Sequence, residues 1–193
     1  MRSVIKRFDR FLRRRLEIFE FTRDPECVLR LRWVQARREV RLDHYLIRPG
    51  DRLLELHLWN ERLPIATLGG AGLAYGVDAR RLMLKSLRLV AQELSCNPQL
   101  SGALAVYGLT GLIDVGATTG GEKLARRLGF RLLPYQPPLG RFGEFWEYVY
   151  ARALVWAYNP AGLRSLRFSK FRRTEIWMLK EELLRRFLEP GNC

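Results

Sequence analysis

Residues 50–64, GDRLLELHLWNERLP, alternate between apolar and other side chains, and this alternation limits the possible folds more than any other part of the sequence. Successive side chains of an extended chain point to opposite faces, so a period of two residues predicts a β-strand over 52–60. One face would carry Leu54, Leu56 and Leu58, and the other Glu55, His57 and Trp59. Because an apolar strand face has to be covered by a second layer, the pattern predicts a domain built on a sheet.

Strand and helix patterns follow one another in mixed order along the rest of the chain. Further strands are predicted at 27–33, 39–46, 103–109, 130–135 and 173–179, the first two as a hairpin or meander. Helices are predicted within 4–21, 78–95, 121–128, 145–159 and 180–188. With 193 residues, 48% of them hydrophobic, we expect a single α+β domain over 23–193. It would contain a mixed central sheet with flanking helices, and a basic amphipathic helix would precede it within 1–22.

The positive charge is concentrated towards the two ends of the chain. There are 34 Lys and Arg residues against 20 Asp and Glu residues, a formal net charge of +14. Residues 1–41 hold 13 bases and 6 acids, and residues 164–186 hold 8 bases and 3 acids. Such a surplus attracts polyanions, so nucleic acid and an anionic membrane surface are both candidate partners.

The first segment combines this charge with an apolar stripe. Apolar residues recur at helical spacing at Ile5, Phe8, Leu12, Leu16 and Phe19, and bases occupy the other sides. Such a helix suits an anionic membrane surface, contacted through residues 1–20, and it equally suits packing onto the domain.

The segment 142–158 is rich in aromatic residues and has two interpretations. It is either part of the core, which we favour, or a platform on which nucleic-acid bases stack.

Cysteine usage and hydropathy bear on location. Cys27, Cys96 and Cys193 are odd in number, far apart and outside any metal-ligand spacing, which predicts a reducing compartment and no metal site. The N-terminus is interrupted by charges, unlike the apolar core of a signal peptide. The longest apolar run, at 103–113, is shorter than the roughly 20 residues that span a bilayer. We expect a cytoplasmic protein, with peripheral attachment to the inner face of the membrane as the more specific alternative.

Glu55 and His57 are the candidate catalytic residues. A carboxylate or an imidazole on a strand beside a cleft can take a proton from a substrate, and the alternative is an ordinary polar face. A hydrolytic triad is not expected, because His44 and His57 are the only histidines and no G-x-S-x-G elbow occurs.

The glycine-rich segment LGGAGLAYG, at 68–76, precedes the helix predicted to start at its N-cap Asp78. Amides near Gly76 could hold a phosphate there, with Arg80 and Arg81 adding positive charge. A plain connection is the alternative, because neither nucleotide-binding fingerprint is present. GATTGG at 116–121 is a second glycine-rich segment of the same kind.

Three segments carry a family resemblance. GDRLLELHLWNERLP, GGEKLARRLGF and RRTEIWMLKEELLRR, with a helix and a strand between the first two, resemble the YkoP-like domain. That domain occurs alone and attached to polysaccharide deacetylases, which implies an envelope enzyme as a partner. The resemblance covers nearly the whole chain after the first helix and brings no established catalytic residues with it.

The element order also resembles, more distantly, the GNAT acyltransferase core. In that superfamily an LGF triplet, here at 128–130, commonly closes the helix before a late strand. A base often lies on the strand that leads to the acyl-CoA loop, so the resemblance implies Glu55 or His57 as the base. It also implies acyl-CoA as the cofactor, with its pyrophosphate held near Gly76–Arg81. The [QR]-x-x-G-x-[GA] loop of that superfamily is absent from this position.

These observations lead us to expect one of three functions. The first is a peripheral GNAT-like acyltransferase, or a degenerate relative of one, in lipid or cell-envelope metabolism. The second is a non-enzymatic accessory module that docks on an envelope-polysaccharide enzyme. The third is a nucleic-acid binder that acts through its basic ends.

Overall fold

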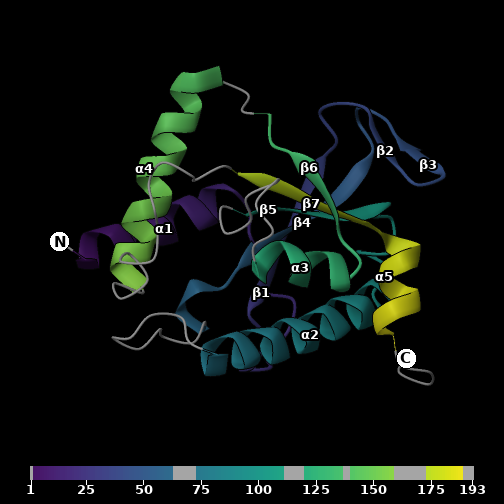
Figure 1. Ribbon diagram of the computed structural model, residues 1–193, viewed down its shortest axis with the longest axis horizontal. Coiled ribbons are helices and arrows are strands. Elements are labelled where there is room, and N and C mark those ends of the chain that lie inside the picture. The colour runs from purple at the N-terminus through teal and green to yellow at the C-terminus, as the bar shows by residue number, and fades with distance from the viewer. Residues whose placement is uncertain (1, 63–72, 111–119, 137–139, 159–172, 189–193) are drawn as a thin grey trace.

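The 52–60 strand pattern forms the second strand of the central sheet. The computed structural model describes residues 2–62, 73–110, 120–136, 140–158 and 173–188. The sheet has five strands in the order β1-β4-β5-β7-β6. They are β1 (Leu29–Gln35), β4 (Arg52–Leu58), β5 (Ala105–Thr110), β7 (Thr174–Leu179) and β6 (Arg131–Pro134). β4 and β5 run parallel, and the other neighbouring strands run antiparallel (Figure 1).

Three helices cover the apolar face of this sheet. They are α2 (Leu73–Cys96), α3 (Gly120–Arg127) and α5 (Lys180–Phe187). Leu54 and Val106 from the sheet are fully buried in one cluster with Leu87 of α2 and Leu183 of α5. The predicted α+β fold with a mixed sheet and flanking helices in a single domain is thus confirmed.

The opposite face is covered over part of its area by a small hairpin. Strands β2 (Val40–Leu42) and β3 (Tyr45–Ile47) pair only with each other within the described residues. Val40, Leu42 and Ile47 form a second core cluster with Leu53 of β4 and Ala105 of β5. The polar side chains of β4 lie on this same face, beyond the apolar cluster.

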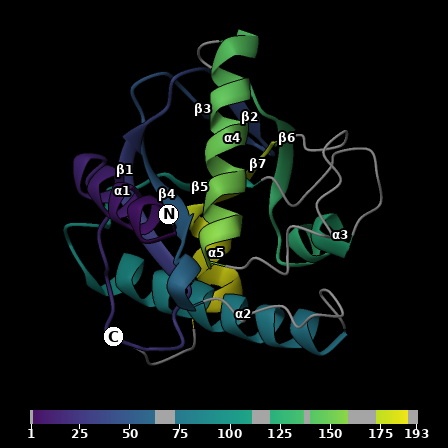
Figure 2. The ribbon, with the colours of Figure 1, turned by 90° about the vertical axis from the view of Figure 1, so that its left-hand side faces the viewer.

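Two further helices lie together at one end of the sheet. α1 (Arg2–Arg15) packs against α4 (Gly140–Tyr158), and the two lie side by side in both views (Figures 1 and 2). This is the end where the parallel strands β4 and β5 finish and where β7 begins. None of the helices in the described ranges is both long enough and apolar enough to cross a bilayer.

Three predictions about elements were wrong. The strand predicted at 27–33 pairs with β4 and not with the following segment, which forms its own hairpin. The first helix ends at Arg15, because Phe19 instead pairs with Leu31 through main-chain hydrogen bonds at the edge of β1. Asp78 is not an N-cap, since α2 is already helical from Leu73. Residues 68–72 of the first glycine-rich segment and 116–119 of the second lie outside the described residues.

Candidate functional site

A row of polar and aromatic residues crosses the face of the sheet that carries Glu55. The pairing register places one residue of each strand side by side on this face. From β1 to β6 they are Arg32, Glu55, Tyr107, Trp177 and Arg131. Because the row spans the only parallel strand pair of the described sheet, it brings together residues that are far apart in sequence.

Glu55 is a buried carboxylate held by neighbours of opposite charge. Its side chain is only 10% exposed, with Oε2 lying 3.1 Å from His57 Nε2 and 3.4 Å from Arg32 Nη1. Burial raises the pKa of Glu55, but the contact with His57 and the charges of His57, Arg32 and Arg37 outweigh burial, so the net pKa is lowered. Glu55 is therefore ionised at neutral pH.

His57 is the more accessible member of the pair. Its side chain is 27% exposed, although its Nε2 atom is buried and makes no well-directed hydrogen bond to the described residues. This nitrogen lies 3.1 Å from Oε2 of Glu55. The pair has the arrangement of an imidazole that accepts a proton beside a carboxylate that stabilises the resulting charge.

Tyr107 of β5 lies next to Glu55 of β4, and its ring packs at a tilt of 44° against Trp177 of β7, with ring centroids 4.7 Å apart. Burial raises the pKa of Tyr107 strongly, and the negative charges of Glu55 and Glu175 raise it further. The phenol therefore keeps its proton at neutral pH and can donate a hydrogen bond.

Glu175 is a second buried carboxylate on this face, two residues before Trp177 on β7 and opposite Leu109 of β5. Its Oε2 atom accepts a hydrogen bond from the Trp177 indole at 2.9 Å and another from Arg38 at 2.6 Å. Arg38 comes from the segment that leads into the hairpin, so this contact ties the hairpin to β7. Glu175 is fully engaged as a structural acceptor.

Trp59 was predicted to share the polar face of β4, and it lies just beyond the end of that strand. The guanidinium groups of Arg30 and Arg62 lie over its ring, 4.0 and 3.3 Å from the centroid. Arg30 is buried and also forms ion pairs with Glu20 and Glu61. Because cations close to the indole occupy the ring face, we assign Trp59 to the packing of this edge and not to substrate contact.

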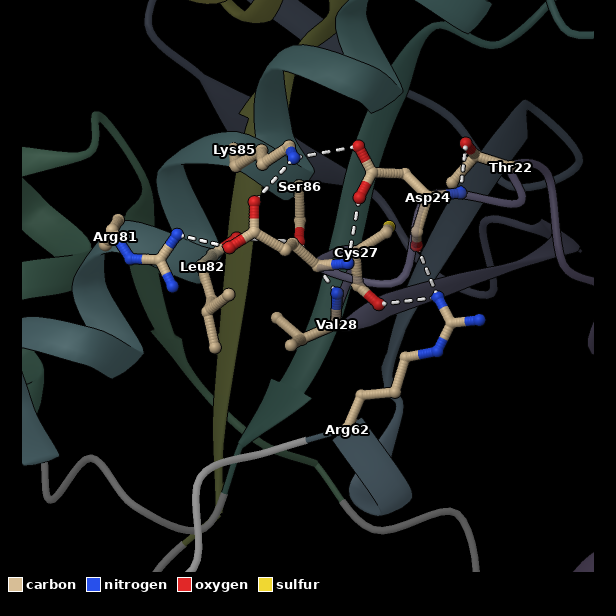
Figure 3. Close-up of polar contacts among 10 residues, drawn as sticks. Thr22, Asp24, Cys27, Val28, Arg62, Arg81, Leu82, Lys85 and Ser86 are labelled. Carbon is tan, nitrogen blue, oxygen red and sulfur yellow. Dashed lines mark hydrogen bonds and ion pairs between the residues drawn. The ribbon is translucent and has the colours of Figure 1, made fainter.

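The four residues predicted to bind a cofactor all lie in the first part of α2. A helix leaves only its first amides unbonded, and α2 already includes Leu73, so the amides from Val77 onward are engaged within the helix. Asp78 and Arg80 are exposed. Arg81 Nη1 lies 2.5 Å from Glu26 Oε1, which engages its charge (Figure 3). The structure does not bring these residues into contact with Glu55 or His57.

The segment before β1 is fastened to α2 by a polar network that the sequence did not indicate (Figure 3). Lys85 forms ion pairs with Asp24 at 2.9 Å and with Glu26 at 2.6 Å. The hydrogen bond from Lys85, followed by that from Arg81, lowers the pKa of Glu26. Beneath them the buried hydroxyl of Ser86 accepts a hydrogen bond from the Val28 amide at 2.8 Å.

The cysteines divide into two kinds. Cys27 is a free, fully buried thiol whose pKa is raised by burial. Cys96 is disulfide-bonded. The disulfide runs against the reducing compartment that was predicted from the odd number of cysteines. Across the ranges that the structure describes, no group of three His, Cys, Asp or Glu side chains could hold a metal ion.

The sequence analysis missed Arg32 and Tyr107 as members of the site. Both became neighbours of Glu55 through the register of strands that are distant in sequence. The available signal was the alternation in CVLRLRW and ALAVYGL, which puts Arg30 and Arg32 on one side of the first strand and Tyr107 on a defined side of the second. That alternation could not tell which strands would be adjacent.

Comparison with known proteins identifies a family for this fold. The model of the YkoP domain matches residues 2–187, which is nearly the whole chain and includes every described strand. Neither a curated protein nor a solved structure matches the chain. The chain belongs to the YkoP domain family.

Proposed function

We propose that this YkoP domain protein is a GNAT-like acyltransferase, or a degenerate relative of one, in lipid or cell-envelope metabolism and peripheral to the membrane. The observation that carries the proposal is the Glu55–His57 pair on β4. In the described sheet β4 and β5 are the only neighbouring strands that run parallel. In the GNAT superfamily a base often lies on the corresponding strand. The element order, and the LGF triplet that closes α3 before β6, support the same relationship.

Glu55 and Tyr107 of the row, together with His57, suit the transfer of an acyl group from a thioester to an amine or hydroxyl. The attacking group has to lose a proton as it bonds to the acyl carbon, and the thiolate of the donor leaves. His57 takes that proton in its neutral form, and the imidazolium that forms lies 3.1 Å from the Glu55 carboxylate. Tyr107, which stays protonated, supplies a hydrogen-bond donor next to the pair.

Binding of acyl-CoA has partial support from the described residues. The acyl-CoA would supply the activated thioester. Gly76 and the exposed Arg80 both lie in the first part of α2, and Arg80 supplies a positive charge for a phosphate. Arg81 contributes less, because Glu26 already engages it. Residues 63–72, which precede this helix, lie outside the described part of the chain.

The test separates binding from transfer. The purified protein is titrated with acetyl-CoA and longer acyl-CoAs, and its melting temperature is followed. A ligand at a hundred times its Kd should raise the free energy of unfolding by about 2.7 kcal/mol. Transfer to amine and alcohol acceptors is then followed by mass spectrometry of the acylated product. We expect Glu55→Gln to keep the thermal shift and to lose transfer.

The matched control is Glu39→Gln, which removes the same charge from an exposed position. It should retain both binding and transfer. If no acyl-CoA raises the melting temperature, the acyltransferase proposal fails, and recovery of an envelope-polysaccharide enzyme in a pull-down would support the accessory-module function. If Glu55→Gln transfers as well as the unchanged protein, Glu55 belongs to an ordinary polar face.

A further inference from the structure

The surface formed by α1 and α4 exposes large apolar side chains that the fold does not cover. Phe11 is 62% exposed and Phe8 51% on α1, while Phe145 is 57% exposed and Trp146 55% on α4. Val149 is also exposed. The aromatic segment 142–158 was expected to be core, and at Phe145 and Trp146 that prediction is wrong. An exposed group of this kind marks a surface that contacts something else.

These side chains form one continuous strip across the two helices. The ring of Phe8 meets the edge of Tyr150, with centroids 6.1 Å apart. Trp146 lies four residues before Tyr150 and therefore on the same side of α4, and its ring is 5.5 Å from that of Phe145. Phe11 extends the strip along α1, three residues after Phe8.

A buried contact fixes which face of α1 points outwards. Asp9 is 6% exposed, and it accepts hydrogen bonds from the hydroxyls of Tyr150 at 2.8 Å and Tyr158 at 3.0 Å. Lys6 lies over the Tyr158 ring, 4.9 Å from its centroid. The helix is thus held against α4 through Asp9, which leaves Phe8 and Phe11 on the outside.

Positive charge borders the strip. Arg7 lies four residues before Phe11, and Arg14 and Arg15 lie three and four residues after it, so all three flank its ring along the helix. All three are exposed. α1 has seven Lys and Arg residues, and its only acidic residue, Asp9, is buried against α4. The outward face of α1 is therefore apolar at its centre and basic at its margin.

We propose that α1 and α4 together form a docking face for an anionic lipid bilayer. The aromatic side chains of both helices enter the interfacial region, and the arginines of α1 contact the lipid phosphates. A second copy of this chain fits less well, because it would bring two strongly basic helices together. An aliphatic side chain such as Val149 also offers nothing to stacked nucleic-acid bases, whereas a bilayer accepts it.

The experiment is sedimentation of the full-length protein with vesicles of phosphatidylcholine alone and of phosphatidylcholine with 30% phosphatidylglycerol. We expect at least tenfold stronger binding to the anionic vesicles at low salt. Phe145→Ser/Trp146→Ser, on α4, should weaken this binding at least fivefold, and Phe11→Ser, on α1, should do the same. Binding should fall in 0.5 M NaCl and persist in part, because apolar insertion is not screened.

The control is Tyr45→Ser, which removes an exposed aromatic side chain from the hairpin strand β3 and should bind as the unchanged protein does. Three results would overturn the proposal. The first is that the double variant on α4 still binds anionic vesicles as strongly as the unchanged protein does, which would mean that the charge of α1 alone accounts for binding. The second is no vesicle binding together with tight oligonucleotide binding. The third is a dimer in solution that Phe11→Ser converts to a monomer.

Discussion

Glu55 shows how a buried carboxylate remains charged in this protein. Transfer of an ionised group out of water is unfavourable, and unless it is compensated the group takes up a proton. Here Arg32 from β1 and His57 from its own strand lie against a single oxygen atom, Oε2, and their effect exceeds that of burial. The charge depends on side chains from two strands, so it is a property of the folded sheet.

The first prediction concerns the pH dependence that this lowered pKa causes. A carboxyl group whose pKa is lower in the folded than in the unfolded protein stabilises the fold above its unfolded pKa of about 4.3. The contribution is lost as the pH falls through the folded pKa. We expect Glu55→Gln to be less stable than the unchanged protein by about 1–3 kcal/mol above pH 5, and the difference to shrink below pH 4.5. Urea unfolding at pH 3.5 to 7 measures it.

Glu39→Gln is the control here as well, since Glu39 is exposed. Its difference from the unchanged protein should be close to zero across the same pH range. A Glu55→Gln difference that stays constant down to pH 3.5 would contradict the lowered pKa.

At the residue scale, the sequence was sufficient where the geometry is local. The sides on which Leu54 and Glu55 lie follow from the period of two, and the structure confirms both. The partners of Glu55 did not follow, because Arg32 and Tyr107 reach it through strand pairing. Nor could the period of two show that Glu55 would be buried and still ionised, since that depends on those partners.

At the scale of elements, the end of α3 is set by one glycine. Gly129 has a φ of +97°, a left-handed conformation in which a side chain is strained. Its amide donates to the Arg126 carbonyl at 3.0 Å, and the Phe130 amide donates to the Ala125 carbonyl at 3.0 Å. These two bonds close the helix and turn the chain into β6.

The second prediction is that Gly129→Ala destabilises the fold by about 1–3 kcal/mol. The added Cβ would be strained by the positive φ and would lie 2.6 Å from the Arg186 side chain on α5. Gly76→Ala is the matched control, because Gly76 lies within α2 and a Cβ there meets nothing within 4 Å. That change should stabilise by about 0.5–1 kcal/mol. Equal changes in melting temperature for the two variants would contradict the role of Gly129 in ending α3.

The third prediction concerns the attachment of the 22–28 segment to α2. Ser86→Ala removes the acceptor of the buried Val28 amide, which should cost about 1–3 kcal/mol. Gln92→Ala, at an exposed position of the same helix, is the comparison. Urea unfolding of both variants should show a loss for Ser86→Ala only.

Local patterns predicted most elements, and the errors arose where a distant partner decided the outcome. The strand at 27–33 was correctly identified but assigned to the wrong neighbour, because antiparallel pairing with β4 cannot be seen in either strand alone. The first helix was predicted too long, since Phe19 has a helical position in the sequence and a main-chain partner on β1 in the fold. Asp78 was predicted to be a cap because Asp is a preferred N-cap residue and follows a glycine-rich segment, whereas α2 already includes Leu73.

At the scale of the whole molecule, α1 is joined to the remainder mainly through α4. The hydrogen bonds from Tyr150 and Tyr158 to Asp9 are the polar part of this junction. The junction lies at the end of the sheet where β4 and β5 finish. Along β4, Glu55 and His57 follow Leu53, which packs under the hairpin, and so lie nearer to that end than Leu53 does. The candidate membrane face and the candidate acyl-transfer site are therefore arranged towards the same end of the protein.

The fourth prediction is that Asp9→Ala loosens α1 without unfolding the sheet. The change removes the acceptor of two tyrosine hydroxyls, so local opening of α1 should become at least about tenfold more frequent. Limited trypsin digestion followed by mass spectrometry should show faster cleavage at the arginines of α1, with little change in the main thermal transition. Asp9→Asn, which keeps one acceptor oxygen, should be intermediate, and Glu39→Ala should behave as the unchanged protein does.

The position of β7 has a consequence for the synthesis of the protein. β7 is the last strand along the described residues, yet it lies inside the sheet, between β5 and β6. Until the ribosome has released residues 174–179, β5 lacks one neighbour and β6 lacks any partner in the described sheet. The nascent chain therefore cannot close this sheet before residues 174–179 have been translated, and a product that stops short of β7 exposes unpaired strand edges to aggregation.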